Sequence, residues 1–149
     1  MKSLLISRCL LGDACRYDGK SKPLPAETLQ ALRSRYELIP VCPEVLGGLP
    51  TPRTPSERQG SRVVMQTGAD VAAEYRRGAE ATLRLALAHN VCAAVLKERS
   101  PSCGKGEIYD GTFTGTLKEG NGVTAEVLMD AGVAVYGESE IAKLIKSGA

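Results

Sequence analysis

The stretch that decides the fold is residues 67–97, TGADVAAEYRRGAEATLRLALAHNVCAAVLK. Residues 67–70 offer a helix start with a carboxylate in the first turn, and apolar residues then recur at helical spacing to about Ala88. Asn90 can close this helix in the left-handed conformation. Residues 91–97 form an apolar run that is typical of a strand buried on both faces. A long helix followed by such a strand predicts a parallel sheet covered by helices.

The same alternation extends to both sides of this stretch. Strands are expected at residues 3–9, 37–42, 62–67 and 133–136, and helices at residues 25–34, 123–131 and 139–146. Pro40 indicates that its strand is distorted or near an edge. Residues 43–61 are expected to form an ordered loop, and residues 111–122 a hairpin or turn-rich loop. We therefore predict an α/β protein with a Rossmann-like, three-layer fold, a mostly parallel sheet of about four core strands and a small hairpin.

Length and composition limit the possible functions. The 149 residues are 43% hydrophobic and 24% charged, which predicts one globular domain over residues 1–149. A formal net charge of +2, with five Tyr, one Phe and no Trp, disfavours nucleic-acid binding. No apolar run is long enough to span a membrane, and Arg8 interrupts the apolar start too early for a signal peptide. We therefore expect a cytoplasmic protein whose thiols stay reduced.

The five cysteines need an explanation. Cys9 and Cys42 end two predicted strands, and Cys103 lies in the loop after the third main strand. The carboxyl ends of parallel strands share one edge, so these three thiols are expected to meet there. Thiolates repel one another unless a thiophilic metal centre supplies positive charge, and the alternative is that the cysteines are small buried hydrophobes. That alternative is preferred for Cys92, which lies within a predicted strand, whereas Cys15 is either a fourth ligand or a bystander.

The spacing of the cysteines narrows the kind of metal centre. Structural zinc sites use close cysteine pairs, but neither C-x2-C nor C-x4-C occurs, and His89 is the only histidine. Three thiolates from remote loops suit an iron–sulfur cluster with one open iron, although spacing alone does not prove it.

Polar residues next to these cysteines are candidates for chemistry. Glu44, two residues after Cys42, is either a general acid or base or a solvated loop residue. Ser100 and Ser102 lie just before the third cysteine, and either hydroxyl can bind substrate, orient water or cap a turn. Basic residues on the same loops would offset cluster charge or hold an anionic substrate, unless they are solvated surface residues. They are Arg8, Arg16, Lys20, Arg53, Lys97, Arg99 and Lys105.

Motifs in these loops resemble those of a known family. The matching segments are CLLG at 9–12, RYDG at 16–19, CPE at 42–44, GLPTPR at 48–53, SPSCG at 100–104, YDGTF at 109–113 and GVTA at 122–125. They are spread over nearly the whole chain and together resemble the signature of the DUF523 family. That family includes bacterial thiouracil desulfidases, and the chain is similar to its stand-alone, single-domain members.

This resemblance implies a fold, a cofactor and a reaction. It implies a Rossmann-like domain that holds a [4Fe-4S] cluster with one open iron through Cys9, Cys42 and Cys103. The implied reaction removes sulfur from a thiolated pyrimidine such as 2-thiouracil, with the thione sulfur bound at the open iron, and gives uracil and sulfide. The catalytic residues would be Glu44 and Ser100, and the expected substrate-binding residues are Ser102, Arg16 and Asp18. The implied partners are a small thiolated nucleobase and the iron–sulfur assembly machinery.

Two other functions remain as alternatives at this point. One is a metal-free persulfide or redox sulfur carrier that uses Cys9 and Cys42. The other is a module that binds thiouridine-containing tRNA, which the near-neutral charge and the few aromatic residues disfavour. The sequence leaves open the physiological substrate, the oligomeric state and which of Ser100 and Ser102 faces the substrate.

Overall fold

The computed structural model describes residues 1–148, and its centre is a four-stranded sheet. The strands are β1 (Lys2–Ser7), β2 (Tyr36–Val41), β5 (Ala93–Leu96) and β8 (Val135–Gly137), in the order β2-β1-β5-β8. Every neighbouring pair is parallel, as predicted. The chain builds the sheet first to one side of β1 and then to the other, so the switch point lies between β1 and β5.

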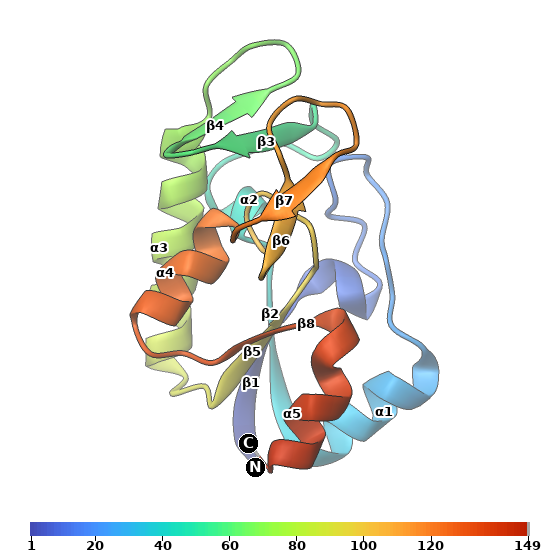
Figure 1. Ribbon diagram of the computed structural model, residues 1–149. Helices are drawn as coiled ribbons and strands as arrows, with labels where there is room; N and C mark the ends of the chain where they lie inside the picture. Colours follow the sequence, from blue (N-terminus) through green and yellow to red (C-terminus); the bar gives the residue numbers. More distant parts are fainter. Residues whose placement is uncertain (149) are drawn as a thin grey trace.

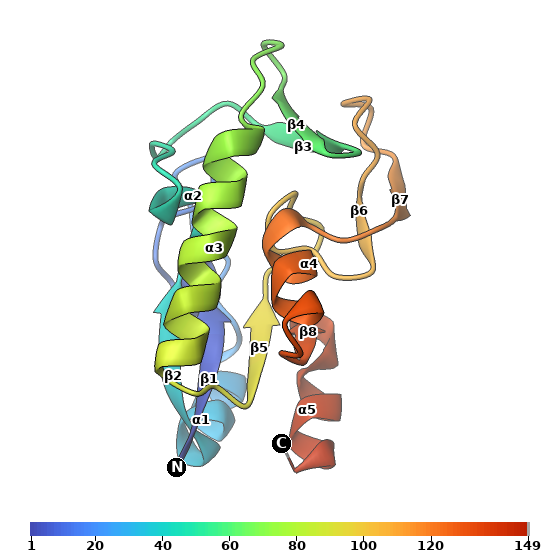
Figure 2. The ribbon, with the colours of Figure 1, turned by 90° about the vertical axis from the view of Figure 1, so that its left-hand side faces the viewer.

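Helices cover both faces of the sheet, which gives the predicted three layers (Figure 1). One face carries α1 (Ala26–Arg35) and α5 (Ile141–Ser147), and the other carries α3 (Ala72–Ala88) and α4 (Val123–Asp130). Figure 2 shows α3 running along the sheet beside β1 and β2.

Alternate side chains of β1 supply the two cores, because successive residues of a strand point to opposite faces. Leu4 belongs to the core that contains Leu32 of α1 and Leu144 of α5. Leu5 belongs to the opposite core, which contains Leu128 of α4. All four residues of β5 are buried, as expected for a strand covered on both faces.

Residues 67–97 form the predicted helix, α3, and the predicted strand, β5. Asp70 accepts a hydrogen bond from the backbone N–H of Ala72 at 2.9 Å, at the start of α3. Asn90 follows α3 in the left-handed conformation with φ of +49°, as predicted. Cys92 precedes β5 instead of lying within it, and its half-buried side chain packs against the α1 and α5 core. Pro40 lies in β2, which is an edge strand.

The first predicted strand, at residues 3–9, is wrong at its carboxyl end. β1 stops at Ser7, and Arg8–Leu11 form the short 3-10 helix η1. Gly12 closes η1 with φ of +102°, a conformation that glycine adopts without a steric penalty. Cys9 is therefore held by a tight turn beyond the strand.

Two antiparallel hairpins stand above the carboxyl edge of the sheet (Figure 1). They are β3 (Ser56–Gln59) with β4 (Arg62–Met65), and β6 (Glu107–Tyr109) with β7 (Leu117–Glu119). The expected loop at residues 43–61 is wrong in part, because it contains α2 (Pro43–Leu46) and β3. The proline that opens α2 is favourable at the first helical position. The short helix η2 (Glu138–Glu140) lies between β8 and α5.

None of the helices in the described part of the chain combines the length and the apolar character needed to cross a bilayer.

Candidate active site

A cavity of about 560 Å³ lies at the carboxyl edge of the sheet. Its walls come from the segments after β1, β2 and β5, from α2 and α3, and from both hairpins. This is the position predicted for the binding crevice, because ligands of open parallel sheets bind beyond the carboxyl ends of the strands near the switch point.

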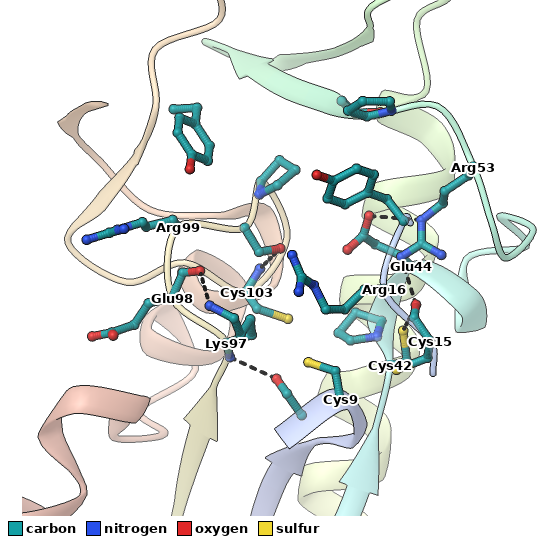
Figure 3. A pocket seen from close by; sticks show the side chains of 18 of the residues that line it. Cys9, Cys15, Arg16, Cys42, Glu44, Arg53, Lys97, Glu98, Arg99 and Cys103 are labelled. Atoms are coloured by element: carbon teal, nitrogen blue, oxygen red, sulfur yellow. Dashed lines mark hydrogen bonds and ion pairs between the residues drawn. The ribbon is translucent and has the colours of Figure 1, made fainter. Parts of the chain in front are cut away.

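Four of the five cysteines line this cavity (Figure 3). The three predicted ligands are nearly inaccessible to solvent, with exposed fractions of 6% for Cys9, 8% for Cys42 and 5% for Cys103. Cys15 is also 6% exposed. Cys92 is outside the lining. The structure thus brings the three predicted thiols to one space and adds a fourth beside them.

Backbone hydrogen bonds fix the loop after each strand. The carbonyl of Cys9 accepts the N–H of Lys22 at 3.0 Å, and that of Cys42 accepts the N–H of Leu46 at 3.0 Å within α2. The Cys42 thiol donates to the carbonyl of Cys15 at 3.7 Å, which ties the first loop to the second.

The Ser100 hydroxyl organises the loop that carries Cys103. Its oxygen accepts the backbone N–H groups of Ser102 and Cys103, both at 3.1 Å. The start of α4 holds the same loop, because the N–H of Thr124 donates to the carbonyl of Ser102 at 2.8 Å. A Cβ at Gly122 would overlap the backbone of Ser102, so this close approach requires glycine. The GVTA motif therefore anchors the thiol loop.

The thiols of Cys42 and Cys103 disfavour their charged form in the absence of a cation. Burial raises the pKa of the Cys103 thiol to about 12. The pKa of Cys42 is also raised, first by its hydrogen bond with Cys15 and then by burial. Three thiolates here would need nearby positive charge, which a metal centre supplies.

The arrangement of donors is compatible with an iron–sulfur cluster. Within residues 1–148, no three His, Cys, Asp or Glu side chains are close enough to hold one metal ion. An iron–sulfur cluster needs no such convergence, because each thiolate binds a different iron. Three buried thiols around a cavity of about 560 Å³ therefore fit a cluster held by Cys9, Cys42 and Cys103.

Charged side chains in the lining favour a negatively charged occupant. The six basic residues are Arg8, Arg16, Lys22, Arg53, Lys97 and Arg99, and the three acidic residues are Glu44, Glu57 and Glu98. Carboxylates outside the lining pair with three of the basic residues, so the positive charge left to offset a thiolate-bound cluster is smaller than this count. The pairs are Arg8 with Asp13, Arg16 with Asp18 and Lys97 with Glu138.

Glu44 extends from α2 into the same cavity (Figure 3). Its Oε2 accepts a hydrogen bond from the Tyr75 hydroxyl at 2.6 Å and from Arg53 Nε at 3.3 Å. The sequence does not indicate Tyr75 as a site residue, because its spacing matches the buried apolar face of α3. The available signal was its hydroxyl, since a buried tyrosine usually has a hydrogen-bond partner.

The expected substrate-binding residues do not all reach the cavity. Arg16 lines it, as does the expected catalytic residue Ser100. Asp18 lies outside the lining, where it pairs with Arg16 at 3.7 Å and accepts the backbone N–H of Lys20 at 3.0 Å. Ser102 is also outside, because its hydroxyl is buried 2.7 Å from that of Thr124.

A family model and a solved structure identify the family of this chain. The model of the 2-thiouracil desulfurase family matches residues 4–140. An uncharacterized protein of Bacillus subtilis (strain 168), YbbK, is 41% identical over 148 residues, which cover 93% of this chain and 97% of that protein. The solved structure of the [4Fe-4S]-dependent thiouracil desulfidase TudS (DUF523Vcz) has a TM-score of 0.94 at 46% identity, over 99% of this chain and 97% of the other. The predicted family is thereby confirmed: the chain belongs to the 2-thiouracil desulfurase family of enzymes.

Proposed function

We propose that this protein is a [4Fe-4S]-dependent desulfidase that converts a thiolated pyrimidine, such as 2-thiouracil, and water into uracil and hydrogen sulfide. The observation that carries the proposal is the meeting of three buried thiols and Glu44 in one cavity, in a chain of this family. The reaction exchanges a C=S bond for a C=O bond and consumes no electrons, so no reductant is needed.

Cys9, Cys42 and Cys103 would hold the cluster. When bound by three thiolates, a [4Fe-4S] cluster has one iron without a protein ligand, which is a Lewis acid for the thione sulfur. Cys15 stays outside this proposed ligand set, although it lies beside Cys42.

Glu44 would act as the general base and acid. Its Oε2 is engaged by Tyr75 and Arg53, and within residues 1–148 its Oε1 accepts no hydrogen bond. Oε1 would take a proton from the attacking water and return it to the departing sulfur. Proton transfer by a positioned side chain typically contributes about 10²- to 10⁴-fold to the rate.

Ser100 and Arg16 would orient the substrate and water. The Ser100 oxygen already accepts two backbone N–H groups, so its hydroxyl proton can be donated to the substrate or to water. Arg16 carries donors for a pyrimidine carbonyl oxygen. We leave Ser102 and Asp18 out of the substrate contacts, since neither lines the cavity.

The cellular setting follows from the same chemistry. The cluster would be supplied by the iron–sulfur assembly machinery, and the substrate would be a small thiolated nucleobase. We propose that residues 1–149 form one catalytic domain. We place it in the cytoplasm, because its five free cysteines suit a reducing compartment.

Anaerobic purification followed by a turnover assay tests the proposal. Protein reconstituted with iron and sulfide should be coloured and should release uracil and sulfide from 2-thiouracil in equal amounts. Glu44→Gln should keep the visible absorption of the cluster and lose turnover. A colourless protein that carries persulfide on its thiols would instead support the metal-free carrier, and an active Glu44→Gln variant would exclude Glu44 as the proton carrier.

A further inference from the structure

The carboxylate of Glu44 is fixed through one of its two oxygens. The Tyr75 hydroxyl and Arg53 Nε both donate to Oε2, at 2.6 Å and 3.3 Å. The other oxygen accepts no hydrogen bond from the described part of the chain. Two donors on one oxygen stop the carboxylate from rotating, so the free oxygen has a defined direction.

Tyr75 reaches Glu44 because α2 and α3 pack unusually closely. A Cβ at Gly78 of α3 would overlap the carbonyl of Pro43, and one at Gly47 would overlap the carbonyl of Glu74. These two glycines therefore let the helix backbones touch. Tyr75 lies one helical turn before Gly78, opposite the residue that follows Pro43.

Apolar neighbours hold the ring of Tyr75, and its polar contact with Glu44 is made by the hydroxyl. The side chain is 2% exposed and belongs to a small core with Leu49, Val63 and Val71. Burial, and next the charge of Glu44, raise the pKa of Tyr75, so the phenol stays protonated and keeps donating.

Arg53 lies in the segment between α2 and β3, and its side chain is itself held in place. Its side chain is 3% exposed. Its guanidinium also donates to the carbonyls of Pro50 and Cys15, both at 3.1 Å. A fork of donors bound at several points is pre-organised before it meets the carboxylate. Figure 3 shows Arg53 beside Glu44 on the side next to Cys15.

We propose that Tyr75 and Arg53 are positioning residues that anchor Oε2 of Glu44 and thereby aim Oε1 at the water that attacks the substrate. This inference rests on the proposed function, in which Glu44 transfers the proton. Tyr75 also lines the cavity, and its hydroxyl is engaged by Glu44, so its proposed role is exerted through that carboxylate.

Tyr75→Phe tests the inference most sharply, because it removes one hydroxyl and keeps the buried ring. With the reconstituted enzyme, kcat for 2-thiouracil should fall on the order of 10- to 100-fold, as expected for a misdirected catalytic group. KM, the visible absorption of the cluster and the iron content should stay at wild-type values. Tyr36→Phe is the matched control, since Tyr36 is 3% exposed and lies in the other core. That control should keep the wild-type kcat.

A crystal structure of the Tyr75→Phe variant gives a readout that does not depend on activity. The Glu44 carboxylate should leave its single position or occupy several. An unchanged Glu44, an unchanged kcat, or a raised KM with normal kcat would overturn the positioning role. If the wild-type enzyme does not act on 2-thiouracil, the proposed function fails, and the position of Glu44 still decides whether Tyr75 anchors it.

Discussion

The two edges of the parallel sheet are built in different ways. At the amino edge, short connections lead into β5 and β8, and single residues with positive φ, Asn90 and Gly132, turn the chain. At the carboxyl edge, long segments follow β1, β2 and β5, and side chains such as Ser100 and Arg53 hydrogen-bond their backbones together. The amino edge needs only to reverse the chain, whereas the carboxyl edge holds chemical groups in place. Loops on a rigid scaffold commonly carry function in this way.

Removing one thiol from each edge should give the largest contrast. Cys103→Ala removes a proposed ligand at the carboxyl edge, and Cys92→Ala removes the half-buried thiol at the amino edge. Cys103→Ala should lose the cluster and all turnover, because two thiolates remain where three are required. Visible absorption and bound iron measure this loss. Cys92→Ala should keep both at wild-type values, and a cluster retained in Cys103→Ala would remove that residue from the ligand set.

Neutralising the side chain of Glu44 should give the next largest effect on turnover. Glu44→Gln keeps the shape of the side chain and removes its ability to accept a proton. Turnover of 2-thiouracil should fall by about 10²- to 10⁴-fold, the usual contribution of a general base. Visible absorption should show an intact cluster. Glu98→Gln is a control on another carboxylate of the cavity wall, and it should lose far less activity.

Substituting one glycine at each edge of the sheet compares how much each turn contributes to the free energy of unfolding. Gly122→Ala places a Cβ against the backbone of Ser102, and we expect a loss of about 1–3 kcal/mol in the free energy of unfolding. Gly132→Ala meets no atom within 4 Å, but its φ of +86° costs roughly 1–2 kcal/mol for a residue with a side chain. Denaturant unfolding of the cluster-free proteins measures both losses.

The bound iron then separates the two edges. Gly122→Ala should lower iron content, because the displaced loop carries Cys103, whereas Gly132→Ala should leave it unchanged. Equal iron content in the two variants would show that the GVTA motif does not hold the thiol loop.

The smallest effect on turnover is expected at Ser102. Ser102→Ala breaks the buried hydrogen bond with Thr124, which should cost about 1–3 kcal/mol of stability. Since Ser102 lies outside the cavity lining, kcat/KM for 2-thiouracil should stay close to wild type. Ser100→Ala is the comparison and should lower kcat. A large loss of kcat/KM confined to Ser102→Ala would return that residue to the substrate site.

The sequence predicted the sheet well because its strands are buried. The helix before Asn90 has a clear period and the strand before Lys97 is a continuous apolar run, and both are confirmed. The α2 helix was missed because its four residues are too few for a helical pattern and glycine and proline surround it. Strand ends were less accurate, since the turn at Cys9 depends on local hydrogen bonds.

The sequence predicted those parts of the site whose positions follow from the order and direction of the strands. Parallel strands place Cys9, Cys42 and Cys103 at one edge, and the structure brings all three to the cavity. The sequence does not say which of two neighbouring hydroxyls faces the cavity, because this depends on tertiary contacts: Ser100 lines the cavity, whereas the Ser102 hydroxyl contacts that of Thr124. Tyr75 was hidden for the opposite reason, since it has the spacing of a core residue and only its contact with Glu44 distinguishes it.

We propose that three thiols of the carboxyl edge hold a cluster with one iron left for the substrate. Mössbauer spectroscopy of the reconstituted protein, with and without 2-thiouracil, tests it most directly. We expect about four irons per chain, with one iron whose signal differs from the others and changes when 2-thiouracil is added. A spectrum in which all irons have full sulfur ligation and none responds to the substrate would contradict it and would indicate Cys15 as a fourth ligand.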